Sequence, residues 1–292
     1  MYINRIVNCV TVCKLNLFAD DALLWIDAEN LEEAMENITV DFRNIVQFLC
    51  MMKLSLNWQK TKLMIIGDRI SEIEFLDLDG NKIERVRSMK YLGVIIDEAL
   101  HFKENLGHVA KKMSRKVGFL NRNREKMSME TRLTLYKCMI GPNLDYCSSI
   151  LYLNSDTDLK TLQKIQNRAL RVITRSDRYE SINEMLNMTQ LLNVKQRINY
   201  NILIFVYRAK KGLLPRYLTA NIMTVGELQP YSLRNNGHLR PVSSILHSNQ
   251  DSVWYKGIRM FNEMCKKFNC NTENINEFKK MAVQYVKNNY NL

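Results

Sequence analysis

The stretch LNLFADDALLWIDA, residues 15–28, places two aspartates between two apolar runs. Leu15–Phe18 precede the pair, and Leu23–Ile26 follow it. Large apolar residues on both sides of a short polar break predict a β-hairpin. Carboxylates are unfavourable between apolar strands unless they face solvent or bind a cation. We therefore expect Asp20 and Asp21 at the turn, either as a plain solvated pair or as ligands of Mg²⁺, which prefers carboxylate oxygens.

An amphipathic helix follows the hairpin. Apolar residues recur at three- and four-residue spacing over residues 31–52, which is the pattern of a helix with one buried face. Asn30 can cap this helix. Glu32 and Glu33 lie in its first turn, where carboxylates favour the positive end of the helix dipole.

The rest of the chain predicts short strands and then helices. Strand candidates are 63–66, 73–78 and 90–96, with a turn at Asp79-Gly80. The 292 residues contain only 10 Gly and 4 Pro, and this scarcity favours long helices. Expected helices lie at 103–122, 129–140, 156–175, 180–187, 190–211 and 274–288, with a loop-rich connector at 212–250. The expected fold class is α+β.

The chain is strongly basic, with a formal net charge of +12. Such an excess predicts a polyanionic partner, either nucleic acid or an anionic membrane surface. Nucleic acid is favoured because no amphipathic terminal anchor is visible. No apolar run approaches the roughly 20 residues that span a bilayer, so no membrane partner is expected.

The 7 cysteines are odd in number and widely scattered. This pattern predicts free thiols without a disulfide-linked partner, in a cytoplasmic or nuclear compartment. Cys265 and Cys270 lie closest together, but no further ligand follows at the spacing of a metal site. We therefore expect them to be structural.

Two segments, residues 103–126 and 159–178, concentrate positive charge on predicted helices. Residues 159–178 place their cations at alternating four- and three-residue spacing, opposite an apolar stripe. Such a stripe can follow phosphates without distinguishing bases, although a solvated helix face has the same pattern. A membrane-surface helix is disfavoured because the apolar side lacks bulky aromatics. The cations that we expect to bind nucleic acid are Lys111, Lys112, Arg115 and Lys116 in the first segment, and Lys164, Arg168, Arg171 and Arg175 in the second.

These segments together resemble a known family. LNLFADDALLWIDA is similar to the active-site hairpin of reverse transcriptases, whose signature is an aromatic residue, a small residue and two aspartates. The resemblance to the non-LTR (LINE-type) retrotransposon enzymes continues in order over nearly the whole chain. Its further blocks are LSLNWQKTKLMII (54–66), MKYLGVIID (89–97), LHFKENLGHVAKKMSRKVGFL (100–120), LYKCMIGPNLDYC (135–147), LQKIQNRALRVIT (162–174), VYRAKKGLLPRYL (206–218), and VWYKGIRMFNEM (253–264) with FKKMAVQYVKN (278–288).

The resemblance implies RNA-directed DNA synthesis, with an RNA template and a DNA primer as partners and two Mg²⁺ ions (or Mn²⁺) in the complete enzyme. Asp20 matches the main metal ligand and Asp21 its weaker neighbour, while Phe18 matches the aromatic residue that packs under the turn. Lys60 or Lys62 matches the lysine that assists departure of pyrophosphate, and a solvated lysine on a polar turn is the alternative interpretation of either one. The primer grip is matched by Tyr91, Leu92 and Gly93, where glycine would allow close approach of a nucleic-acid backbone.

The same resemblance implies three segments. Residues 1–98 would be a partial palm with the primer-grip hairpin, 99–150 thumb-like helices, and 151–292 a helical carboxy-terminal region. MYINRI, residues 1–6, resembles the piece after the family's Gln-Gly block. We therefore expect the fingers and the first catalytic aspartate to be missing from this sequence, and the 292 residues to be inactive alone.

Two other functions remain open. One is a non-enzymatic remnant that only binds nucleic acid, and the other is a host protein that uses the helices as an interaction module. A remnant should show decay in the acidic hairpin, yet Phe18, Ala19, Asp20 and Asp21 are intact. A host module should show an added domain, and none is visible in the sequence.

Overall fold

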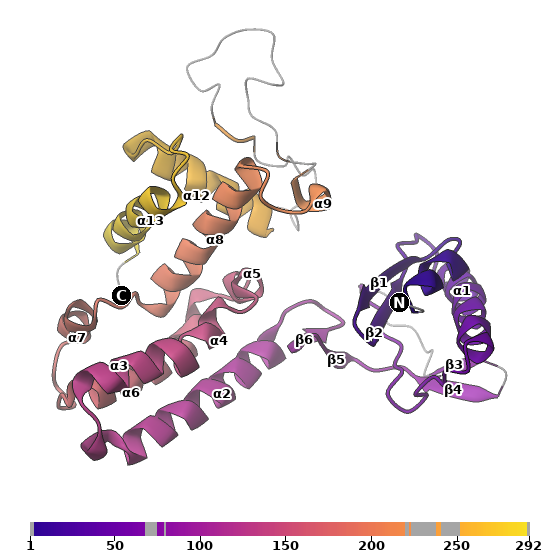
Figure 1. Ribbon diagram of the computed structural model, residues 1–292, viewed down its shortest axis with the longest axis horizontal. Helices are drawn as coiled ribbons and strands as arrows, with labels where there is room; N and C mark the ends of the chain where they lie inside the picture. The colour runs from indigo at the N-terminus through magenta and orange to yellow at the C-terminus, as the bar shows by residue number, and fades with distance from the viewer. Residues whose placement is uncertain are drawn as a thin grey trace, which may run out of the picture. The chain divides into compact units, whose positions relative to one another are not determined.

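The computed structural model describes residues 3–67, 75–78, 80–219, 222, 238–240 and 252–290 (Figure 1). The chain divides into two compact units. The first comprises residues 1–90 with 97–100, and the second comprises 91–96 with 101–292. The strands form small two-stranded sheets, and most of the other described residues lie in helices. The expected α+β class is therefore confirmed.

The first unit is built on the acidic hairpin. Strands β1 (Lys14–Phe18) and β2 (Asp21–Trp25) pair antiparallel, with Phe18 opposite Asp21. Ala19 and Asp20 form the turn between them, and Ala19 adopts a φ of 55°. The apolar side of the hairpin packs against helix α1 (Leu31–Met51) and the 3₁₀ helix η1 (Ile3–Cys9). The hairpin and the helix that the sequence predicted are both confirmed.

A buried aspartate fixes the segment that leads into the hairpin. Asp41 of α1 is completely buried. One of its carboxylate oxygens accepts the N–H of Thr11 at 2.9 Å and its hydroxyl at 2.8 Å. The other accepts the N–H groups of Val12 and Cys13 at 2.9 and 2.8 Å. Burial alone would raise the pKa of Asp41, but these donors hold it well below its usual range. The charge therefore stays, and β1 begins at a fixed point on α1.

The remainder of the first unit differs from expectation in its strands. Strands β3 (Phe75–Leu78) and β4 (Asn81–Glu84) form an antiparallel pair. The strand expected at 63–66 is wrong, because only Leu63 pairs, in a single parallel bridge to Arg85. Leu63 is buried in a small core, whereas Ile66 is exposed, so only one residue of the run is anchored. Residues 73–74 and Asp79 of the expected strand and turn lie outside the described residues.

The stretch expected as one strand at 90–96 contains a hairpin. Strands β5 (Ser88–Tyr91) and β6 (Val94–Asp97) form a two-stranded sheet. Leu92 and Gly93 make the turn, with φ values of 45° and 85°. Two successive residues with positive φ are typical of the tight turns that match the twist of a hairpin.

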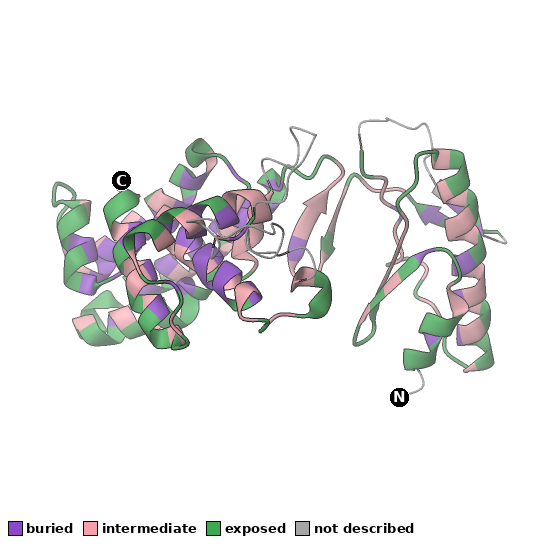
Figure 2. Cartoon of the chain, turned by 90° about the horizontal axis from the view of Figure 1, so that it is seen from above, coloured by how far each residue is buried: buried purple, intermediate pink, exposed green. Residues whose placement is uncertain are grey.

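The second unit is helical. Its inner faces form two apolar cores, one around α2, α6 and α7 and one around α8, α12 and α13. Figure 2 shows buried residues toward the middle of this cluster of helices and exposed residues at its rim. Its helices are α2 (Lys103–Arg122), η2 (Arg124–Lys126), α3 (Met129–Leu135), η3 (Tyr136–Ile140), α4 (Pro142–Asp145), α5 (Ser148–Tyr152), α6 (Asp156–Thr174), α7 (Ile182–Thr189), α8 (Val194–Lys210), α9 (Arg216–Thr219), α12 (Val253–Lys267) and α13 (Ile275–Asn289).

Most helices agree with the sequence, and the differences have local causes. The helix expected at 129–140 changes to a π-helical turn, η3, at Tyr136. The helix expected at 190–211 starts only at Val194, because Asn193 and Gln196 form a capping box there. The connector expected at 212–250 lies largely outside the described residues.

Helix α12 is absent from the sequence expectations. Gly257 lies in its interior, and glycine disfavours helices. The structure explains the glycine by close packing against α8. A Cβ atom at this position would lie 2.9 Å from Ile202 Cγ2 and 3.2 Å from Val206 Cγ2. The missing side chain therefore lets the two helices meet.

We predict that Asp41→Asn lowers the free energy of unfolding of the first unit by about 3 kcal/mol. The amide nitrogen would confront N–H groups that now donate to a carboxylate oxygen. Hydrogen exchange at the β1 and β2 amides in the full chain measures this loss. Glu36→Gln, at an exposed position of the same helix, is the control. Equal exchange in both variants would contradict the anchoring role.

The same interaction predicts a pH dependence. Because the folded pKa of Asp41 is depressed, its contribution is complete above the unfolded pKa of about 4 and is lost as pH falls toward the folded value. Hairpin protection should therefore decline below about pH 4 in the native chain. In Asp41→Asn this part of the decline should disappear.

Candidate functional site

The acidic pair lies at the tip of the first hairpin. Asp20 is in the turn, Asp21 is the first residue of β2, and both are exposed. Phe18 is 62% exposed, so the expectation that its ring packs under the turn is wrong. Phe18 is the last residue of β1 and pairs with Asp21 directly beside the turn.

The chemistry of the acidic pair fits a hard cation. Its donors are carboxylate oxygens, which Mg²⁺ and Mn²⁺ accept readily. Two adjacent residues of one turn supply only part of a coordination shell. Within the described ranges, no cluster of three or more His, Cys, Asp or Glu side chains could hold a metal. Asp20 and Asp21 therefore fit as a partial metal site that needs further oxygen ligands.

The two candidate lysines differ in their surroundings. The ammonium group of Lys62 lies 2.6 Å from a carboxylate oxygen of Glu84 on β4. Lys60 lies in an exposed turn, where its backbone N–H donates to the backbone oxygen and the side-chain oxygen of Asn57 at 3.1 and 3.2 Å. The charge of Lys62 is thus used within the first unit, and Lys60 is the better candidate for a leaving-group lysine.

The tip of the β5–β6 hairpin is held by residues of the second unit. The hydroxyl of Tyr146 donates to the backbone oxygen of Leu92. The side-chain oxygen of buried Asn105 accepts the N–H of Ile95 at 3.1 Å. Gly93 is explained by its positive φ, and the nearest side chain to its absent Cβ is the ring of Tyr146 at 3.6 Å. The role of Tyr91, Leu92 and Gly93 as a primer grip stays a prediction.

An ion pair supports Tyr146 in turn. The carboxylate of its neighbour Asp145 accepts hydrogen bonds from Nε and Nη2 of Arg197 on α8, at 2.7 and 2.6 Å, and from Nδ2 of Asn201 at 3.1 Å. Burial alone would raise the pKa of Asp145, but the Arg197 and Asn201 hydrogen bonds lower it. This bidentate ion pair joins α4 to α8 and so fixes the end of α4, which Tyr146 follows.

The two basic segments come together on α2 and α6. Nη1 of Arg168 lies 3.5 Å from Oγ of Ser114, and Nη2 of Arg175 lies 3.2 Å from the backbone oxygen of Arg124. The partner of Arg168 is residue 114 and the partner of Arg175 is residue 124, so both segments advance in the same direction. Helices α2 and α6 therefore lie side by side and parallel. We call the exposed cations Lys111 and Arg115 of α2 with Lys164 and Arg168 of α6 the basic face.

Three of the other cations expected to contact nucleic acid make hydrogen bonds or ion pairs within the protein. The ammonium group of Lys116 donates to the oxygen of Met139 at 2.8 Å and to the side chain of Asn143 at 3.0 Å. Arg175 pairs with Glu125 of η2 at 3.1 Å. Arg171 donates to the backbone oxygen of Arg178 at 3.3 Å. Lys112 is half-buried. The roles of these four residues stay predictions; Arg175 is paired with a carboxylate, whereas Lys116 and Arg171 hydrogen-bond neutral oxygens and keep their charge.

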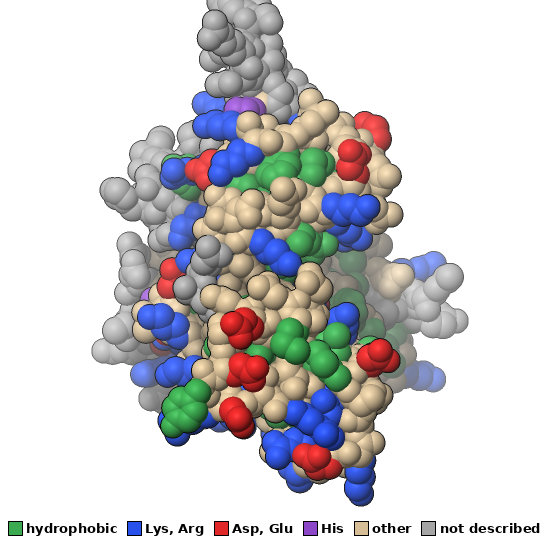
Figure 3. Space-filling view, turned by 90° about the vertical axis from the view of Figure 1, so that its left-hand side faces the viewer, with side chains coloured by type: hydrophobic (Ala, Val, Ile, Leu, Met, Phe, Trp, Pro, Cys, Tyr) green, Lys and Arg blue, Asp and Glu red, His purple; other side chains and the backbone are tan. Residues whose placement is uncertain are grey.

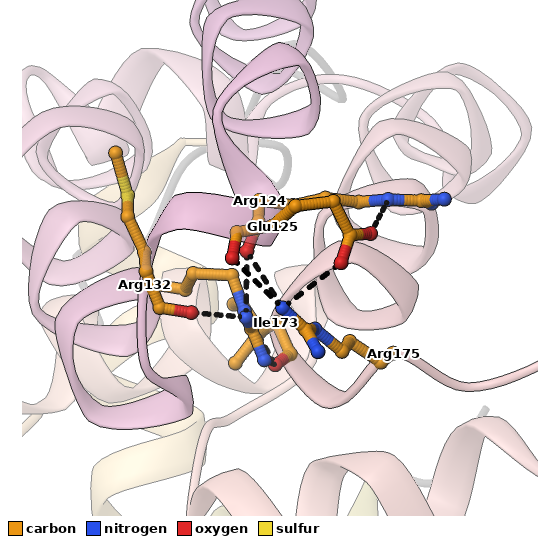
Figure 4. Close-up of polar contacts among 6 residues, drawn as sticks. Arg124, Glu125, Arg132, Ile173 and Arg175 are labelled. Carbon is orange, nitrogen blue, oxygen red and sulfur yellow. Dashed lines mark hydrogen bonds and ion pairs between the residues drawn. The ribbon is translucent and has the colours of Figure 1, made fainter.

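A buried arginine holds the end of α6 in place. Nε and Nη2 of Arg132 donate to the backbone oxygen of Ile173 at 2.9 and 2.7 Å. Its Nη1 donates to the oxygens of Arg124 and Met127 at 2.9 and 2.6 Å. Figure 4 shows this contact with Arg175 and Glu125 beside it. The guanidinium satisfies backbone oxygens that a helix end and a loop leave free.

Sequence reasoning missed Arg132, although a signal was present. Met129, Arg132, Tyr136 and Ile140 follow the three- and four-residue spacing of a buried helix face. A cation at such a position predicts a buried contact with backbone oxygens.

An exposed carboxylate pair on a hairpin tip and a basic helical face are features of proteins that act on nucleic acid. Comparison with curated proteins supports this class. The RNA-directed DNA polymerase from mobile element jockey of Drosophila funebris is 24% identical over 160 residues, which cover 54% of this chain and 18% of that protein. The probable RNA-directed DNA polymerase from transposon X-element of Drosophila melanogaster is 34% identical over 95 residues, 32% of this chain and 10% of that protein.

A third relative is the putative 115 kDa protein in type-1 retrotransposable element R1DM of Drosophila melanogaster, 24% identical over 144 residues, 48% of this chain and 14% of that protein. The chain is thus homologous, over part of its length, to RNA-directed DNA polymerases of non-LTR retrotransposons, which confirms the family predicted from the sequence blocks. It spans less than a fifth of the length of these relatives. No protein-family model matches the chain, and no solved structure matches it.

Two further findings bear on the expected partners. Among the described residues, no helix is long and apolar enough to cross a membrane. All seven cysteines are free thiols in this structure. Cys270 is buried and Cys265 is half-buried, and the structural role expected for this pair stays a prediction.

We predict that Arg132→Met lowers the free energy of unfolding of the second unit by about 3 kcal/mol, because it leaves buried backbone oxygens without donors. Urea denaturation of the full chain, followed by far-UV circular dichroism, measures the change. The control is Arg124→Met, which removes an exposed ion pair with Glu125 and should cost less than about 1 kcal/mol. Equal losses in the two variants would show that the buried contact has no special weight.

Proposed function

We propose that this chain forms the metal-binding hairpin and the nucleic-acid-holding helices of an RNA-directed DNA polymerase of the non-LTR retrotransposon type. The exposed Asp20–Asp21 pair at the hairpin tip carries the proposal, supported by homology to polymerases of this type. The class of reaction is nucleotidyl transfer, in which a primer 3′-hydroxyl attacks the α-phosphate of a nucleotide and pyrophosphate leaves.

In this proposal the hairpin contributes carboxylate oxygens to a site completed by other ligands. Bound Mg²⁺ would supply positive charge near the reacting phosphate. Asp20 and Asp21 would hold that charge in place because Asp41 fixes the start of β1 on α1. Lys60 would donate a proton or a hydrogen bond to the departing pyrophosphate. The anchored strand makes the turn a rigid support, as precise catalysis requires.

The basic face would hold template and primer through their phosphates. Lys111, Arg115, Lys164 and Arg168 are exposed on two adjacent helices. Contacts of this kind depend on charge and spacing and not on base identity. The hairpin tip at Tyr91–Gly93 would contact the primer, supported by its tight turn and by the tie from Tyr146.

A chain that only binds nucleic acid is the alternative function. The observation in its favour is that the basic face is built entirely within the second unit and does not need the acidic hairpin. Nucleic-acid binding without dependence on Asp20 or on a divalent cation would favour this alternative.

We predict sequence-independent binding of RNA–DNA duplex with steep salt dependence. About five neutralised phosphates imply a log–log slope of about −4.5. The double variant Lys164→Gln/Arg168→Gln should flatten the slope by about 2. Fluorescence anisotropy over a salt series measures it.

The matched control removes the same charge elsewhere. Lys266→Gln/Lys280→Gln changes exposed lysines of α12 and α13, which pack on the other core. Its slope should change by less than half as much. Identical slopes in the two double variants would mean that the basic face is only a solvated surface.

We also predict that these 292 residues alone do not extend a primer on an RNA template with Mg²⁺ or Mn²⁺. Asp20 and Asp21 approach an ion from a single turn, whereas two closely spaced ions need carboxylates from several directions to offset their repulsion. Primer extension with the purified chain tests this, beside Asp20→Ala. Extension that Asp20→Ala abolishes would refute the prediction and would show that the hairpin suffices.

A further inference from the structure

Tyr179 is the most exposed large side chain with apolar character in the described part of the chain. It lies between α6 and α7 and is 95% exposed. A single exposed apolar residue is ordinary on a protein surface. The surroundings of Tyr179 are what make this one informative.

The loop that carries Tyr179 is tied down. The Arg171 guanidinium on α6 donates to the backbone oxygen of Arg178 at 3.3 Å. The hydroxyls of Thr174 and Ser176 lie 2.7 Å apart, and the N–H of Glu180 donates to the oxygen of Asp177 at 3.3 Å. The ring therefore stands in solvent on a backbone held at several points, which reduces the entropy lost when a ligand binds it.

Positive charge leads to the ring along α6. Arg168 and Arg171 lie on α6, Arg175 is the residue at which the helix ends, and Arg178 directly precedes Tyr179 in the loop. Figure 3 faces this end of the helical unit and shows lysine and arginine side chains along its lower part, with acidic side chains among them. A basic row that ends in a free aromatic ring is the arrangement by which proteins hold unpaired nucleotides.

We propose that Tyr179 stacks on an unpaired base of a single-stranded nucleic acid whose phosphates contact the exposed arginines Arg168, Arg175 and Arg178. The proposal rests on the nucleic-acid-binding function above and adds a class of ligand, since a duplex buries its base faces except at its ends. Stacking tolerates any base and does not involve the ribose hydroxyl, so RNA and DNA strands should bind alike. Membrane binding is disfavoured because a single ring offers little apolar area to insert into a lipid surface.

The test compares Tyr179→Ala and Tyr179→Phe in the full chain. The probes are oligouridylate, oligothymidylate and a blunt-ended duplex, each measured by fluorescence anisotropy. Tyr179→Ala should weaken binding of both single strands by about 10-fold and of the duplex by less than about 2-fold. Tyr179→Phe keeps the ring and should bind as the native chain does.

Tyr217→Ala is the matched control, because Tyr217 is also highly exposed, at 76%, but lies on α9. It should leave all three affinities unchanged. The proposal is overturned if Tyr179→Ala leaves single-strand binding intact, if Tyr217→Ala causes the same loss, or if duplex binding falls equally. It is also overturned if Tyr179→Ala weakens binding to phosphatidylserine vesicles while nucleic-acid binding stays the same.

The two proposals fail in distinguishable ways. If Lys164→Gln/Arg168→Gln weakens duplex binding while Tyr179→Ala is neutral on single strands, the basic face stands and the stacking site is refuted. If the native chain binds no nucleic acid, both are refuted.

Discussion

One buried carboxylate determines where the acidic hairpin lies on α1. Asp41 accepts four hydrogen bonds from three consecutive residues, so a segment without regular structure is held as firmly as a strand in a sheet. Asp20 and Asp21 have the same side chain in the opposite environment, open to water at the turn. The carboxylate of Asp41 is satisfied by donors inside the protein, whereas the carboxylates of Asp20 and Asp21 face solvent. This division of roles is what turns a polar turn into a candidate metal site.

Arg132 plays the corresponding part in the helical unit. It is a buried charge whose partners are backbone oxygens and not carboxylates. Neutral oxygens bind the guanidinium without cancelling its charge, so the region near Arg175 remains positive apart from Glu125. The end of α6 is therefore both held in place and kept basic, which suits a surface that meets phosphates.

Local patterns in the sequence predicted the hairpin, α1 and most of the long helices, because spacing and capping are properties of short segments. The apolar positions of α6 and its basic side were predicted in the same way. What the sequence could not predict depends on contacts between distant residues. Asp41 meets residues about thirty positions earlier, and Lys116 donates to residues more than twenty positions later. The expected place of Asp20 and Asp21 at the tip of a hairpin is confirmed, with Asp20 in the turn and Asp21 at the start of β2, yet their metal role stays a prediction.

Helix α12 shows how one missing side chain makes a helix depend on the neighbour against which it packs. Gly257 weakens the helix by itself, by about 1 kcal/mol relative to alanine, and α12 gains its stability only when it lies against α8. Cys265 lies on this helix and Cys270 just beyond it. Cys270 is buried in the core that α8, α12 and α13 share, whereas Cys265 is half-buried, so the reaction of Cys270 with a thiol reagent reports the opening of this core.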